Sequence, residues 1–446
     1  MLVHYAVGGI LLFATFAFGG RYGWAIGPIE AAVAVVAAYW IVRGSRFVGG
    51  ATSGVPRAVR TSAALLLLYV FVQTVPLPPG MVAVLSPATH AIHRNAVAAI
   101  ESLPDARAEI TPLGSPEHQT VSVEQRRRIG RYAERMRGRS SSDWRPIALY
   151  PYAARIDLLR YVAYGLFLWL AASLPRPRTL LYALFTVGSL AAALALVQYA
   201  TWNGRLFWFF EPPEGISLST YNQMFGPFVN PDHFAAFVAM TLVPSIGLPI
   251  QMWSARSSAG NGQGRMISRP LSLAFLCIGL AIMFAALIGA ASRGAFVGAS
   301  AGLLVTVAGL RVTRRRRVRR ERPRRRLTRA ERFKRLVRTA APAVLGIAII
   351  FGGLLFAGSR VAGILETRLN VRSVGATAGF RLSTWSQTVP ILGAFPIFGV
   401  GAGGWRDAFQ QYKRYPLNWV LPNHAHNDYL EWATEVGLVG VALTLF

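Results

Sequence analysis

The chain is poor in cysteine and in acidic residues, and it lacks an evident signal peptide. It contains one cysteine, Cys277, which lies inside an apolar run, so no disulfide framework exists. Its 19 acidic residues stand against 47 basic ones and leave a net charge of +28. No cleavable signal peptide is evident, because residues 2–18 are apolar but lack a basic leader. We interpret this first stretch as a membrane anchor.

Hydrophobic sequence, by contrast, is abundant. Hydrophobic residues make up 53% of the chain, and the mean hydropathy is +0.39. Repeated apolar runs approach the ~20 residues that a helix needs to cross the hydrocarbon core. The runs are continuous rather than alternating, so they predict helices rather than barrel strands. We expect an all-α fold, a polytopic transmembrane helix bundle of about ten spans. The expected spans are residues 3–19, 24–42, 61–76, 154–174, 179–200, 231–252, 271–291, 295–311, 340–357 and 429–446.

Arginine-rich loops between these spans predict the orientation. Short basic loops stay cytoplasmic, and the loops at 43–60, 176–178, 256–269 and 311–338 fall on one side if the spans alternate. The last holds fifteen Arg and one Lys against two Glu. Dense arginine can neutralise nucleic-acid phosphates, but this run has little aromatic interleaving and no recognisable binding module. We interpret it as a topology signal that also contacts anionic membrane lipids, and expect no nucleic acid.

The spans and loops divide the chain into five parts. We expect N-terminal transmembrane helices (1–76), an extracytoplasmic loop (77–153), a central transmembrane bundle (154–357), an extracytoplasmic catalytic loop (358–428) and an incomplete final transmembrane helix (429–446). Because the sequence stops inside the last expected span, we expect the natural protein to continue beyond Phe446.

Arg293 lies in a short turn between two expected spans, on the side opposite the basic loops. An arginine at the bilayer edge can simply extend to the lipid headgroups. An ionisable residue within a membrane segment is nevertheless a functional hypothesis, because its burial is costly. Small neighbours would admit a bulky ligand, and a guanidinium binds phosphate through two parallel hydrogen bonds.

Arg381 lies in an amphipathic-looking segment, residues 379–390, ahead of a glycine-rich stretch at 395–404. The glycines suggest a nucleotide loop, but no strand-to-helix context surrounds them, and the topology puts them outside the cytoplasm. A tight turn or a close backbone approach is the better interpretation. Arg381 is of interest because it is predicted to share a membrane face with Arg293.

His426 directly precedes the last apolar run. Asp428 and Glu431 have the spacing of a capping box, so a helix could begin with Asp428 as its cap. His426 would then lie just ahead of a positive helix terminus, which favours bound anions. If the helix already includes His426, small residues within 433–440 share its face and admit a close neighbour, either a helix or lipid.

His424 and His426 also resemble a metal-binding pair, with Asp428 or Glu431 as further ligands. Two histidines that lie two residues apart on irregular chain are weak evidence for such a site. We therefore expect no metal and no cofactor.

These residues resemble the O-antigen ligase and polymerase superfamily of bacterial polytopic membrane glycosyltransferases. The closing segment has the ligases' extracytoplasmic pattern of His, Asn, nine residues, Gly, two residues and Gly, here His426, Asn427, Gly437 and Gly440. Other motifs of the family recur in the same order, namely the Ser292-Arg293-Gly294 turn, the Arg381 segment with Trp385, and Pro396 followed by Gly399 and Gly401. Asn230-Pro-Asp-His-Phe-Ala235 looks like the family's Asn-rich entry to a helix, and the resemblance covers roughly residues 150–446.

The resemblance implies a GT-C-type glycosyltransferase in the bacterial inner (plasma) membrane with its active site on the periplasmic face. Such enzymes take a glycan from undecaprenyl diphosphate and pass it with inversion to an acceptor hydroxyl on lipid A–core, another glycan or a protein. The ligases do so without nucleotide or metal. The residues that the resemblance assigns are catalytic His426, Arg293 and Arg381, with Asn427, Asn230 and His233 at the substrate. In this scheme the two arginines hold the diphosphate, and His426 assists deprotonation of the acceptor, either as the base or as a group that orients it.

The physical chemistry of the reaction agrees, because cations stabilise a departing diphosphate and histidine accepts protons at neutral pH. Several alternatives stay open at this level. The chain could be an O-antigen or exopolysaccharide polymerase, or a protein O-oligosaccharyltransferase of the same superfamily. It could also transport lipid-linked glycans, although arginines would then be distributed through the depth of the bundle. A structural membrane scaffold gives no reason for polar residues to gather on one face.

Overall fold

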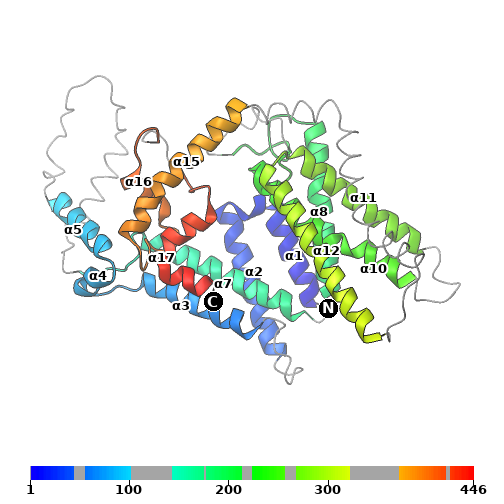
Figure 1. Cartoon of the computed structure of the whole chain (residues 1–446), viewed down its shortest axis with the longest axis horizontal. Helices are drawn as coiled ribbons and strands as arrows, with labels where there is room; N and C mark the ends of the chain where they lie inside the picture. The colour runs from blue at the N-terminus through cyan, green and yellow to red at the C-terminus, as the bar shows by residue number, and fades with distance from the viewer. Residues whose placement is uncertain are drawn as a thin grey trace. The chain divides into compact units, whose positions relative to one another are not determined.

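The computed structural model describes residues 2–44, 56–101, 143–174, 177–212, 224–256, 268–321, 371–417 and 422–445. Within these ranges the chain is helical, and extended pairing is limited to two isolated bridges, Leu77 with Arg145 and Leu206 with Phe210. The helices, labelled in Figure 1, are α1 (Leu2–Phe16), η1 (Phe18–Gly20), α2 (Gly23–Gly44), α3 (Arg57–Thr74), α4 (Pro79–Leu85), α5 (Pro87–Glu101), α7 (Pro151–Ser173), α8 (Pro177–Ala200), α9 (Pro231–Ser245), α10 (Gly247–Arg256), α11 (Ser268–Gly289), α12 (Arg293–Glu321), α15 (Val371–Ala394), α16 (Trp405–Tyr412) and α17 (Asp428–Leu445).

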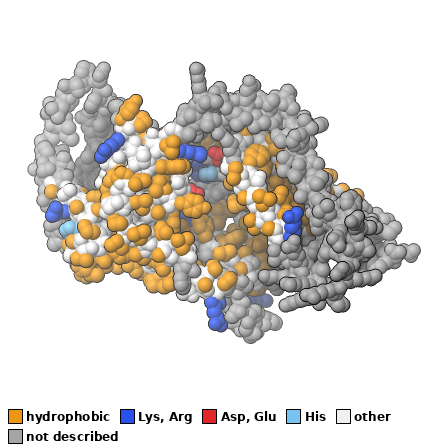
Figure 2. All heavy atoms as spheres, viewed as in Figure 1, with side chains coloured by type: hydrophobic (Ala, Val, Ile, Leu, Met, Phe, Trp, Pro, Cys, Tyr) orange, Lys and Arg blue, Asp and Glu red, His pale blue; other side chains and the backbone are white. Residues whose placement is uncertain are grey.

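Among the described residues, five stretches of helix are long and apolar enough to cross a membrane: Gly23–Arg43, Pro151–Ser173, Arg178–Ala200, Pro231–Ile250 and Leu271–Gly289. Hydrophobic side chains also cover much of the described surface in Figure 2, as expected for a protein that contacts lipid. The predicted all-α membrane fold is confirmed at this level. Helices coincide with nine of the ten expected spans, although α1, α3, α12 and α17 are not among the five stretches above, and the span at 340–357 lies outside the described residues.

The chain forms two compact units, residues 1–51 with 166–374 and residues 52–165 with 375–446. In the first unit α8 packs against α1, α9 and α11, while α12 packs against α9. Small residues allow the close approach of these helices: a Cβ atom on Gly279 would lie 2.4 Å from the Phe185 ring. This is the packing expected within a membrane, where association depends on close contact rather than on exclusion of water.

Two helices of the first unit begin near each other. Met224 lies in the segment that leads into α9. Its N–H donates to the carbonyl of Gly289, the last residue of α11. A Cβ on Gly289 would lie 2.3 Å from the Met224 sulfur, so any larger residue there would displace the Met224 side chain. The 224–230 segment, which leads into α9, is thus joined to the turn at 290–292, which leads into α12.

The second unit is organised by a crossing of residues 396–401 with residues 434–439. Val400 N–H donates to the Thr434 carbonyl (3.0 Å), and Leu438 N–H donates to the Pro396 carbonyl (2.9 Å). α17 leaves the helical conformation at Gly437 (φ 61°, ψ −171°), so the expected continuous final span is interrupted. A Cβ on Gly437 would lie 2.4 Å from the Ile397 carbonyl oxygen, which only glycine permits.

The α3 helix, which lies beside α17 in Figure 1, supplies the missing hydrogen bonds at this break. Its Tyr69 hydroxyl donates to the Val436 carbonyl (2.6 Å), and its Gln73 amide donates to the Phe398 carbonyl (2.7 Å). Both side chains are buried, and unpaired carbonyls there would be costly. The predicted close backbone approach of the glycine-rich stretch is therefore confirmed, and it fixes where α17 begins.

Candidate functional site

One face of α15 carries the first part of the site. Arg381 and Trp385 lie four residues apart, so they occupy neighbouring positions on the same face of the helix. Arg381 is exposed and makes no ion pair with any residue that the structure describes. Phe380, next to it, packs its ring edge-on against the His426 ring, with 5.7 Å between the centroids. The structure thus brings the Arg381 end of α15 to the segment that carries His426.

Ala425 is the residue that fixes this segment. Its side chain is fully buried in an apolar cluster with Ile391 and Phe409. The Trp385 indole N–H donates to its carbonyl (2.9 Å), and its own N–H donates to the Glu431 carboxylate (2.7 Å). Both backbone groups of Ala425 are therefore held by side chains from two different helices.

His426 follows in the left-handed region, with φ 54°, and its side chain is exposed. A non-glycine residue there costs on the order of 1–3 kcal/mol and persists only where the surroundings hold it. The hydrogen bonds at Ala425 provide that restraint. The strain is consistent with a histidine that is presented outward in one set direction.

The start of α17 differs from the predicted capping box. Asn427, not Asp428, is the cap: its side-chain oxygen accepts the Leu430 N–H (3.1 Å), and its carbonyl accepts the Glu431 N–H (2.9 Å). Asp428 is already the first helical residue and is exposed. Of the two geometries considered, His426 lies outside the helix, just ahead of its positive terminus.

The Glu431 carboxylate contacts His424 and the backbone of Ala425, the residue before His426. Its second oxygen is 2.9 Å from His424 Nδ1, and its side chain is 17% exposed against 72% for His424. The Glu431 hydrogen bond raises the pKa of His424, with burial opposing it. No group of three His, Cys, Asp or Glu side chains within the described ranges is arranged to hold a metal ion. The Glu431 carboxylate instead serves Ala425 and His424.

A second carboxylate, Glu435, lies buried one turn further along α17. Its oxygen accepts the Trp405 N–H at the start of α16 (3.3 Å). The sequence reasoning gave roles to neither Glu435 nor Trp385. A signal for Glu435 exists in the sequence, since an acidic residue within an apolar run is costly unless it is paired.

The remaining candidate residues belong to the other unit. Asn230 caps α9, where its side-chain oxygen accepts the Asp232 N–H (2.8 Å), and His233 is exposed in the first turn of that helix. Arg293 is the first residue of α12 rather than part of the turn, and its side chain lies outside the description. The structure brings the segment that carries Arg381 to the segment that carries His426 and Asn427, through the contact of Phe380 with the His426 ring. That Arg293, Asn230 and His233 join them stays a prediction.

Comparison with known proteins bears on the second half of the chain. The O-antigen ligase family model matches residues 278–445, a stretch that contains Arg293, Arg381 and His426 but neither Asn230 nor His233. No curated protein and no solved structure matches the chain. Residues 278–445 of this membrane protein therefore match the O-antigen ligase family model, which confirms the predicted resemblance to the O-antigen ligase and polymerase superfamily over that part of the chain.

Proposed function

We propose that the chain transfers a glycan from undecaprenyl diphosphate to an acceptor hydroxyl at the outer face of the bacterial inner membrane, as an O-antigen ligase does. The observation that carries this proposal is the restrained His426, which is held outward in a strained backbone conformation beside the Arg381 end of α15. A purely structural histidine would not need this strain. The family match supports the same class of reaction.

The donor's diphosphate is the anion that Arg381 is suited to bind. Its guanidinium is exposed and lacks a carboxylate partner among the described residues, so nothing competes with a phosphate. Arg293, at the N-terminus of α12, would bind the second phosphate, where the helix terminus adds a favourable field. Arginine serves this role better than lysine because its fork contacts two oxygens at once.

In the proposed step, the acceptor oxygen attacks the anomeric carbon of the donor glycan. The bond from that carbon to the diphosphate oxygen breaks, and its electron pair leaves with the lipid diphosphate, whose charge the arginines stabilise. The acceptor proton passes to the His426 imidazole. Attack from the face opposite the leaving group inverts the configuration.

Glu431 and Trp385 act as positioning residues in this scheme. Both side chains form hydrogen bonds to the backbone of Ala425, and Ala425 in turn sets the direction of His426. The crossing at Gly437 fixes the start of α17 and thereby the place of Glu431. Sub-ångström positioning of this kind contributes strongly to rate.

The test is a reconstituted reaction of the full chain with membrane-derived lipid-linked glycan and separate acceptors, read by gel and mass spectrometry. A single mass gain on lipid A–core, lost in His426→Ala, supports the ligase. A ladder of repeats on the lipid carrier supports the polymerase, and a glycan on a protein hydroxyl supports the protein-modifying variant. Tight binding of the lipid diphosphate without any product would refute transfer and favour transport.

A further inference from the structure

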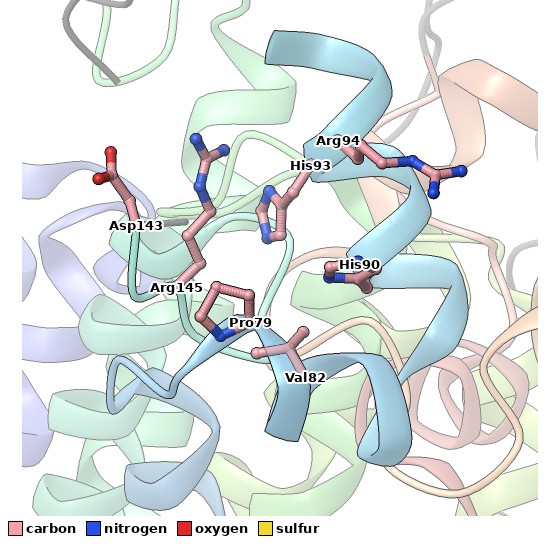
Figure 3. Close-up of a pocket in the computed structure, with 7 residues that line it drawn as sticks. All are labelled: Pro79, Val82, His90, His93, Arg94, Asp143 and Arg145. Carbon is pink, nitrogen blue, oxygen red and sulfur yellow. The ribbon is translucent and has the colours of Figure 1, made fainter. Parts of the chain in front are cut away.

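A second basic site lies in the other part of the same unit, between α4, α5 and the segment that starts at Asp143. Figure 3 shows three α5 side chains, His90, His93 and Arg94, together with Arg145 around this pocket. The pocket opens to solvent, and its enclosed part is only about 10 Å³. None of these residues belongs to the site described above. Arg145 and His93 lie side by side in this view, whereas the Arg94 guanidinium points away from them.

Two polar atoms in this pocket are buried and have no hydrogen-bond partner among the described residues, His93 Nε2 and Arg145 Nη2. Hydrogen bonds hold the backbone of Arg145 and the ring of His93. Arg145 exchanges both backbone hydrogen bonds with Leu77 (2.9 and 3.0 Å), and the His93 ring is bonded to the Pro146 backbone. An unpaired buried donor costs on the order of 1–3 kcal/mol, so native proteins keep few of them. Groups held rigidly but left unpaired indicate a ligand that completes them.

The local electrostatics indicate that this ligand is an anion. Burial lowers the pKa of His93, and the neighbouring Arg145 guanidinium and His90 lower it further. A negative group between these side chains would offset the repulsion among them and favour the charged imidazole. The lining includes one carboxylate, Asp143, which lies at the edge of the pocket and points away from His93 in Figure 3. A phosphate accepts several hydrogen bonds and suits a guanidinium and imidazole donor set.

The surroundings indicate where the phosphate comes from. α4 contributes Pro79 and Val82 to the pocket lining, and two of its other side chains, Met81 and Val84, are 50% and 80% exposed. α4 begins five residues after the end of α3, an expected membrane span. Exposed apolar side chains next to cations are the arrangement of a helix that lies in the membrane interface. We propose that this pocket binds the phosphate group of a membrane lipid, with Arg145 and His93 as its direct ligands.

The site is independent of the transfer reaction, so binding and not turnover tests it. We would titrate the full chain in detergent with phosphatidylglycerol and with phosphatidylcholine, and count bound lipids by native mass spectrometry. Arg145→Gln removes one charged donor and should weaken phosphatidylglycerol binding about tenfold. Arg406→Gln, an exposed arginine of α16 outside the pocket, is the matched control for charge and should change binding less than about twofold.

The stability of Arg145→Gln separates this role from a structural one. Because Arg145 Nη2 has no partner in the described structure, the variant should melt at the wild-type temperature or above it. His93→Gln alters the second proposed ligand and should lose lipid in the same way. Wild-type lipid binding in both pocket variants, or an equal loss in Arg406→Gln, would overturn the proposal. Displacement of the lipid by millimolar inorganic phosphate would overturn the membrane lipid as the source.

Discussion

Removal of the Glu431 carboxylate should slow glycan transfer without weakening donor binding. Its oxygen holds the Ala425 N–H at 2.7 Å, and a charge-assisted hydrogen bond of this kind contributes about 1.5–3 kcal/mol. The Trp385 bond to the Ala425 carbonyl contributes about 0.5–1.5 kcal/mol. The left-handed conformation of His426 costs on the order of 1–3 kcal/mol. With Glu431→Ala, the indole bond alone cannot reliably offset that cost.

The loss in rate follows from these magnitudes. Each 1.4 kcal/mol changes a population about tenfold, so the fraction of chains with His426 correctly placed falls by about 10- to 100-fold in Glu431→Ala. The rate constant of a single-turnover transfer assay should fall by the same factor, while donor affinity stays within about twofold. Glu431→Gln keeps an acceptor for the Ala425 N–H and should recover about half of the lost free energy.

Asp428→Ala is the matched control, because it also removes a carboxylate from the first turn of α17. Asp428 is exposed and is not the cap, so only its interaction with the helix dipole is lost, about 0.3–1 kcal/mol. The positioning argument is refuted by wild-type rates in Glu431→Ala. It is equally refuted if Asp428→Ala loses as much, or if donor affinity falls in step with the rate.

Three further predictions concern stability, measured by thermal melting in detergent. Gly437→Ala should lower the free energy of unfolding by more than about 3 kcal/mol, because its positive φ and its contact with backbone atoms both exclude a Cβ. Gly393 has open space around it, so Gly393→Ala should cause no measurable loss of stability. Asn230→Ala removes the cap of α9 and should lower the free energy of unfolding by about 1 kcal/mol, whereas Asn230→Asp keeps a capping oxygen and should not. Equal losses in the two variants would contradict the capping role. The raised pKa of His424 makes its pair with Glu431 complete below about pH 6.5 and lost as pH rises through the raised value. His424→Gln should therefore be less stable than wild type only in mildly acidic buffer, and only slightly, because solvent screens the 72% exposed ring. A difference in melting temperature between variant and wild type that grows as the pH rises would contradict this.

The helices were predictable because continuous apolar runs carry their own signal in length and composition. The break at Gly437 was not, because it arises from the 396–401 segment, which passes against α17 from 30 or more residues away. Periodicity within one segment cannot register such a contact. The sequence motif nevertheless marked the right glycines, since a close backbone approach was expected for the glycine-rich stretch.

The sequence marked candidate polar residues of the site but not the residues that hold them in place. Arg381 and His426 were visible as polar residues beside apolar runs, and the structure brings their segments together. The cap moved from Asp428 to Asn427 because Asn and Asp are equally good caps in sequence, and only the fold decides between adjacent candidates. Glu431 has capping-box spacing, but in the structure it reaches past the cap to Ala425, a use that depends on where Trp385 lies.

The most direct test of the central claim compares donor binding and single-turnover transfer in His426→Ala and Arg381→Ala, with the full chain in lipid and the lipid-linked glycan as donor. The account predicts that His426→Ala binds the donor within about twofold of wild type but transfers at least about 100-fold more slowly. It predicts that Arg381→Ala weakens donor binding by about tenfold or more. Transfer at the wild-type rate in His426→Ala, or undiminished donor binding in Arg381→Ala, would contradict the assigned roles.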